Sequence, residues 1–178
     1  INFNFLTIVL AIAAMPLAFA YPLMKRFTYW PQLFLGITFN YGLLLGWISV
    51  EESISLIPVI FYFGAIFWTL GYDTIYGLQD MHDDEIIGVK STSIKFKNNI
   101  KIFVGTCYSL CVLLILLLCF MMEINKYLLI LSIFFVITLI YQVKHFKSSN
   151  PKSCLAAFRN NNLTGFFIFL FIFSFNLA

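Results

Sequence analysis

One acidic stretch holds most of the residues in this sequence that could do chemistry. Residues 71–85 contain five of the eight acidic residues of the chain. On a helix, at about 100° per residue, Asp73, Asp80 and Asp84 would lie within about 40° of one another. Asp83 would lie about 60° further round the same helix. The spacing therefore predicts a cluster of carboxylates on one helical face.

Such a cluster suits a metal bound together with a phosphorylated ligand. Neighbouring carboxylates repel one another unless a cation neutralises them. Mg²⁺ typically takes one or two carboxylates and completes its coordination with water and phosphate oxygens. The stretch therefore indicates a site for a metal–pyrophosphate headgroup, with a solvated acidic loop as the alternative. Asp73 favours the site, because it lies at the end of an apolar segment, where an ionisable side chain is costly.

The composition places these residues in a membrane protein. Of the 178 residues, 61% are hydrophobic and only 11% are charged, whereas soluble domains carry roughly 25% charged residues. A soluble domain of about 150 residues buries only about 70% of its unfolded surface, too little to hide so many apolar residues. This excludes a soluble globular, a disordered and a disulfide-stabilised secreted protein. The net charge of +3 gives no argument for a nucleic-acid partner.

Six segments are long and apolar enough to cross a membrane, since a span needs about 20 apolar residues. Backbone groups in lipid must bond internally, so the segments are expected to be helices. They are, in approximate bounds, Phe5–Tyr21, Pro31–Val50, Ile54–Tyr72, Ile102–Met122, Tyr127–Val143 and Leu163–Ala178. We therefore expect an all-α, polytopic transmembrane bundle in a single domain, residues 1–178.

The basic residues orient this bundle. Ten of the eleven follow the first, third and fifth spans, and the positive-inside rule places those loops on the cytoplasmic side or its equivalent. Both chain ends then face the other side, which is expected if an odd number of helices is missing upstream. Lys25, Arg26 and Lys90 lie on the side of the acidic stretch and are candidates for phosphate contacts. His82 is expected to be a solvent-facing loop residue.

Three stretches resemble one family. Residues 72–92, YDTIYGLQDMHDDEIIGVKST, resemble the second aspartate-rich motif of the UbiA prenyltransferases. The resemblance is closest to the 4-hydroxybenzoate polyprenyltransferases of ubiquinone synthesis. Residues 21–32, YPLMKRFTYWPQ, and residues 157–162, AFRNNN, agree with two further stretches of the family in the same order.

The resemblance implies a nine-helix bundle around a central cavity, of which about six helices are present. It implies that Mg²⁺ binds the pyrophosphate of a polyprenyl diphosphate at the cytoplasmic mouth. The prenyl group is then transferred to the ring of 4-hydroxybenzoate, ortho to the hydroxyl. The enzyme would be a multi-pass protein of a bacterial or mitochondrial inner membrane, with its active-site loops on the cytoplasmic or matrix side.

The resemblance also implies roles at matching positions. Asp73 and Asp80 would be catalytic, and with Asp83 and Asp84 they would bind Mg²⁺ through the pyrophosphate. The remaining substrate-binding candidates are residues near the headgroup or lining the mouth: Lys25, Arg26, Tyr76, Lys90 and Asn161, the last within the run Asn160–Asn162.

The sequence departs from the family at its beginning. The first aspartate-rich motif is absent, and the chain begins at what would be the fourth helix. We therefore expect an N-terminally incomplete domain that is inactive by itself. The missing helices could come from a separate chain, or the sequence could derive from a truncated gene or an incomplete gene model.

Other functions stay open at this point. UbiA relatives that use homogentisate, dihydroxynaphthoate or haem as acceptor are the nearest, although the YPLMKR and IGVKST matches favour 4-hydroxybenzoate. A transporter or channel with an acidic cytoplasmic mouth would require broken helices, internal repeats or ionisable residues near the bilayer midplane. The predicted spans are nearly free of such residues. A functionless remnant is the third alternative.

Overall fold

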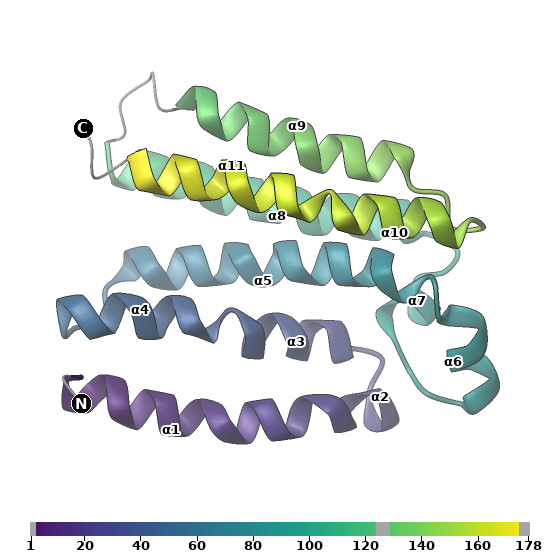
Figure 1. The fold of residues 1–178 in the computed structure, drawn as a ribbon, viewed down its shortest axis with the longest axis horizontal. Helices are drawn as coiled ribbons and strands as arrows, with labels where there is room; N and C mark the ends of the chain where they lie inside the picture. Colours follow the sequence, from purple (N-terminus) through teal and green to yellow (C-terminus); the bar gives the residue numbers. More distant parts are fainter. Residues whose placement is uncertain (1–2, 124–128, 175–178) are drawn as a thin grey trace.

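The computed structural model describes residues 3–123 and 129–174, and within these ranges the secondary structure is entirely helical. The elements in chain order are α1 (Phe5–Ala20), the 3₁₀ turn η1 (Tyr21–Leu23), α2 (Met24–Phe27), α3 (Pro31–Phe39), α4 (Tyr41–Glu51), α5 (Leu56–Gly77), α6 (Met81–Ile87), α7 (Thr92–Lys95), α8 (Ile100–Met121), α9 (Leu129–His145), α10 (Pro151–Arg159) and α11 (Asn161–Ser174). The long helices lie side by side, and α2, α6 and α7 gather at one end of the bundle (Figure 1).

Five stretches in the described residues are long and apolar enough to cross a membrane. They confirm five of the six expected spans, with shifted limits: Phe5–Phe27, Pro31–Glu51, Leu56–Gly77, Ile100–Met121 and Pro151–Phe173. The remaining expected span, Tyr127–Val143, corresponds to the shorter helix α9, whose 17 residues extend over about 25 Å. Residues 124–128, where that span was expected to begin, and residues 175–178, at the end of the last one, lie outside the described residues.

The third span extends further than expected. Its predicted end was Tyr72, just before Asp73, but α5 continues to Gly77. Thr74 belongs to this continuation, because its hydroxyl donates to the carbonyl of Leu70 at 2.6 Å and its side chain is buried. Asp73 therefore lies within the last two turns of a long helix and not in a loop.

Two spans are interrupted by a single asparagine each. Asn40 separates α3 from α4, and Asn160 separates α10 from α11. Backbone hydrogen bonds bridge both interruptions: the Asn40 N–H donates to the Gly36 carbonyl at 3.2 Å, and the Asn160 N–H donates to the Ala156 carbonyl at 3.1 Å. The chain therefore stays helical through both positions.

Helix α5 is the centre of the bundle and packs on α3, α4, α8 and α10. Small residues permit these close contacts, as is usual between membrane helices. A Cβ on Gly36 of α3 would lie 3.1 Å from the Ile66 carbonyl oxygen of α5. A Cβ on Gly71 of α5 would overlap the buried Tyr108 ring of α8. The position of α5, and with it the position of Asp73, depends on these contacts.

We expect Gly71→Ala to destabilise the protein by about 1–3 kcal/mol, because the added methyl group overpacks the α5–α8 contact. Gly42→Ala in α4 is the matched control, since a Cβ there meets no atom of the described residues within 4 Å. Thermal unfolding in detergent should show a lower midpoint for the first variant alone. Equal midpoints for the two variants would contradict the tight packing of α5 on α8.

Candidate active site

The acidic stretch is not one continuous helix. After α5 ends at Gly77, residues 78–80 form a turn, and α6 begins at Met81. The Leu78 N–H donates to Ile75 at 3.3 Å, three residues back, and the Leu78 side chain is buried in the core. These features end α5 and redirect the chain. The expectation that Asp73, Asp80 and Asp84 share one helical face is therefore wrong.

The four aspartates occupy different environments. Asp73 is half-buried on α5, Asp84 is buried on α6, and Asp80 and Asp83 are exposed. Neither Asp80 nor Asp83 has a side-chain hydrogen bond or ion pair among residues 3–123 and 129–174. In the same ranges, no group of three or more His, Cys, Asp or Glu side chains lies close enough to hold a metal ion. Protein carboxylates alone therefore form no complete metal site in this arrangement.

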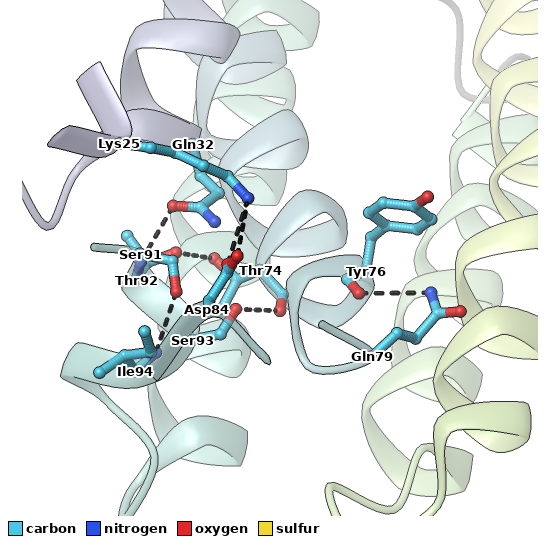
Figure 2. Close-up of polar contacts among 10 residues, drawn as sticks. All are labelled: Lys25, Gln32, Thr74, Tyr76, Gln79, Asp84, Ser91, Thr92, Ser93 and Ile94. Atoms are coloured by element: carbon cyan, nitrogen blue, oxygen red, sulfur yellow. Dashed lines mark hydrogen bonds and ion pairs between the residues drawn. The ribbon is translucent and has the colours of Figure 1, made fainter. Parts of the chain in front are cut away.

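Lys25 pairs with the buried carboxylate of Asp84. Its Nζ lies 3.1 Å from Oδ2 of Asp84 (Figure 2). The Lys25 side chain is 42% exposed, whereas that of Asp84 is 11% exposed. The ammonium group thus holds a buried carboxylate and keeps an accessible side toward solvent.

The other predicted cations differ from Lys25. Lys90 is joined to it through the backbone, because the Lys90 N–H donates to the Lys25 carbonyl at 2.7 Å. The Lys90 ammonium lies 5.6 Å from the Tyr29 ring centroid and donates to the Phe27 carbonyl at 3.4 Å. Arg26 is exposed and has no side-chain partner in the described part of the chain. Lys25 and Lys90 are thus held at the site, and Arg26 is placed beside it on α2.

We call the group formed by Lys25, Asp84 and Lys90 the mouth of the site. A buried layer of polar groups supports it (Figure 2). The Thr92 N–H donates to Oε1 of Gln32 at 2.9 Å, and the hydroxyls of Thr74 and Thr92 lie 2.7 Å apart. Ser93 donates to the Thr74 carbonyl at 2.8 Å. These bonds join α3, α5 and α7. No role was predicted for these residues. The feature of the sequence that could have indicated them is the run of hydroxyl residues, Ser91 to Ser93, that follows Lys90.

Tyr76 and Asn161 lie in two further environments. The exposed Tyr76 ring lies 4.7 Å, between centroids, from the Phe158 ring of α10. Oδ1 of Asn161 accepts from the indole N–H of Trp68 and from Nε2 of Gln142, both at 3.1 Å. The structure therefore places Tyr76 near the mouth and Asn161 in an interhelical network. A contact between Asn161 and a headgroup stays a prediction.

An apolar cavity lies between α4, α5, α8 and α11. One part, of about 220 Å³, is lined by Asn40 and Trp68 among others, and an adjoining part of about 370 Å³ reaches Val50, Glu51 and Met122. The two parts share lining residues: Leu43, Phe61, Ile115, Ile168 and Ile172. The arrangement combines a charged mouth with an apolar interior that can take a hydrocarbon chain.

Comparison with known proteins identifies relatives across the chain. The model of the UbiA prenyltransferase family matches residues 1–174. A 4-hydroxybenzoate geranyltransferase 2 of Lithospermum erythrorhizon is 40% identical over 171 residues, which are 94% of this chain and 55% of that protein. A mitochondrial 4-hydroxybenzoate polyprenyltransferase of Arabidopsis thaliana is 52% identical over 96 residues, 53% of this chain and 24% of that protein.

The human mitochondrial 4-hydroxybenzoate polyprenyltransferase is 48% identical over 99 residues, 55% of this chain and 27% of that protein. This chain therefore spans about half the length of the Lithospermum protein, and the matched segments of the mitochondrial proteins are shorter still. No solved structure matches the chain.

The Lys25–Asp84 pair gives a stability prediction. We expect a double-mutant cycle with Lys25→Met and Asp84→Asn to give a coupling energy of about 1 kcal/mol, because Asp84 is shielded from water. The matched control is the pair Lys97–Glu85, at 2.7 Å with side chains 50% and 37% exposed. Its coupling energy should be only a few tenths of a kcal/mol, roughly 0.3. Unfolding in detergent measures both, and equal couplings would contradict a specific role for Lys25.

Proposed function

This chain belongs to the UbiA prenyltransferase family, and we propose that it transfers a polyprenyl group from polyprenyl diphosphate to the ring of 4-hydroxybenzoate, for ubiquinone synthesis. The observation that carries this proposal is the charged mouth, where Lys25 pairs with Asp84 beyond the end of α5 that carries Asp73, together with an apolar cavity inside the bundle. The names of the relatives, 4-hydroxybenzoate geranyltransferase and polyprenyltransferase, support the acceptor.

We propose that Mg²⁺ enters the site with the diphosphate. Members of the family generally use a divalent metal. The side chains present fit this ion, because Mg²⁺ needs only one or two protein carboxylates when phosphate oxygens complete its coordination. Asp73 and Asp84 would hold it, with Asp80 and Asp83 close by in sequence. When bound, the ion neutralises charge that develops on the departing pyrophosphate.

The protein's own residues bind and orient the donor. Lys25 and Lys90, with Arg26 beside them, hold phosphate oxygens, and the apolar cavity takes the prenyl chain. The C–O bond between the prenyl group and the diphosphate breaks, and its electron pair leaves with the pyrophosphate. The ring carbon ortho to the hydroxyl forms the new C–C bond, and its proton passes to the released pyrophosphate. The apolar lining of the cavity disfavours water beside the allylic cation and so slows its hydrolysis.

We propose a single domain over residues 1–178 in a bacterial or mitochondrial inner membrane. The mouth faces the cytoplasm or matrix, as the asymmetry of the basic residues predicts. The printed names of the Arabidopsis and human relatives place those proteins in mitochondria, which supports this choice. The five long apolar helices make this chain a multi-pass integral membrane protein.

We expect Asp73→Asn to lower prenyl transfer by at least about 100-fold, because the carboxylate acts on charge at the reacting end of the donor. The assay supplies labelled polyprenyl diphosphate, 4-hydroxybenzoate and Mg²⁺ to membranes that contain the protein at its full natural length. His82→Ala is the control, since His82 is exposed on α6 and should leave turnover unchanged. Normal turnover by the Asp73 variant would exclude the pyrophosphate assignment.

Metal removal provides an independent prediction. Chelation with EDTA should abolish turnover, and added Mg²⁺ should restore it, because the carboxylates repel an uncompensated pyrophosphate. Ca²⁺, which prefers more oxygen ligands at longer distances, should restore less. Turnover that persists in EDTA would exclude the metal. Homogentisate and dihydroxynaphthoate in place of 4-hydroxybenzoate test the two alternative aromatic acceptors in the same assay.

A further inference from the structure

Asn40 presents one unused polar atom to the cavity. Its Nδ2 is fully engaged, because it donates to the Gly36 carbonyl and to the Thr69 hydroxyl, each at 2.8 Å, and lies 3.3 Å from the Ala65 carbonyl. Its Oδ1 accepts no hydrogen bond from any described residue, and the side chain lines the cavity. The bonds of the nitrogen therefore fix an acceptor oxygen at the wall of an otherwise apolar space.

Trp68 lines the same part of the cavity, and its ring is also fixed. The indole N–H donates to Asn161 at 3.1 Å, so it is not available to a ligand. Tyr72 and Phe135 contact the indole edge-on, with centroid distances of 5.7 Å and 6.0 Å. Gln142 holds Asn161 in turn. Trp68 therefore contributes a rigid aromatic surface and no donor of its own.

Asn40 and Trp68 lie at the level of α5 that is about one turn inside Asp73. Thr69, which binds Asn40, precedes Asp73 by four residues, so the two lie on the same face of α5 about 6 Å apart along its axis. The partner of the Asn40 amide on α5 is thus one helical turn from the carboxylate at the mouth. The remaining cavity extends away from the mouth toward Val50 and Met122.

We propose that Asn40 and Trp68 form the binding subsite for the ring of the phenolic acceptor. This inference rests on the proposed function. The phenol O–H donates to Oδ1 of Asn40, and the ring packs on the indole of Trp68. A prenyl chain has no donor for this oxygen, whereas a phenol supplies one. The ring carboxylate would be repelled by Oδ1, so it points away from Asn40.

This orientation accounts for the position of attack. With the hydroxyl on Asn40, the adjacent ring carbon is held beside it, at the level of Thr69, which lies one turn of α5 from Asp73. Asn40 is therefore a specificity-determining residue that selects an acceptor with a ring hydroxyl. A phenol is retained by this contact, whereas a benzoate without a donor leaves Oδ1 unpaired.

The test uses the full-length protein in membranes and begins with wild-type turnover of 4-hydroxybenzoate. Asn40→Leu should raise KM for 4-hydroxybenzoate about 10-fold, the effect of one lost hydrogen bond of about 1.4 kcal/mol, with KM for polyprenyl diphosphate unchanged. Thr69→Val is the matched control. It removes one partner of the Asn40 nitrogen, but the carbonyls of Gly36 and Ala65 still hold the amide, so the acceptor KM should change far less.

A ligand without the hydroxyl separates binding from structural damage. Inhibition by 4-fluorobenzoate should be about 10-fold weaker than binding of 4-hydroxybenzoate in the wild type, and equal to it in Asn40→Leu. Asn40→Ala replaces the leucine variant if that one does not fold. A hydroxyl preference unchanged by either variant would overturn the inference while leaving the proposed function intact. Absence of wild-type prenylation of 4-hydroxybenzoate would instead exclude the proposed function.

Discussion

The arrangement depends on one physical constraint: polar groups inside an apolar bundle must find their partners within the protein. Helix α5 carries several of these groups, and other helices provide their partners. Thr69 accepts from Asn40 of the α3–α4 junction, and the Thr74 hydroxyl lies 2.7 Å from that of Thr92 in α7. Trp68 donates to Asn161 of α11. The polar groups of α5 thus fix its rotation, and this rotation determines where Asp73 lies.

The same constraint separates the site into two levels. At the mouth, Gln32, Thr74 and Thr92 hold the segment that carries Asp84 and Lys90. One or two turns further in, Asn40 and Trp68 line the cavity, and α5 connects the two levels through its backbone. A substrate with a charged head and an apolar chain fits this order. Disturbing either level moves the other, because both levels are attached to one rigid helix.

Much of this arrangement could be predicted from the sequence. Five spans followed from length and hydropathy, because the bilayer demands long apolar runs whatever their partners. The turn at residues 78–80 could not, since an amphipathic spacing fits a continuous helix equally well. The contact of Lys25 with Asp84 joins residues 59 positions apart, and no local pattern specifies it. The free oxygen of Asn40 depends on which way its amide points, which packing alone decides.

The charges at the mouth indicate which form of the donor it can bind. Asp73, Asp80, Asp83 and Asp84 carry four negative charges, against three positive charges on Lys25, Arg26 and Lys90. Lys25 is already paired with Asp84. A bare pyrophosphate would add further negative charge to a mouth that already has an excess, and would be repelled. A metal–pyrophosphate complex carries its own compensating charge, so the carboxylates that oppose the free anion attract the complex.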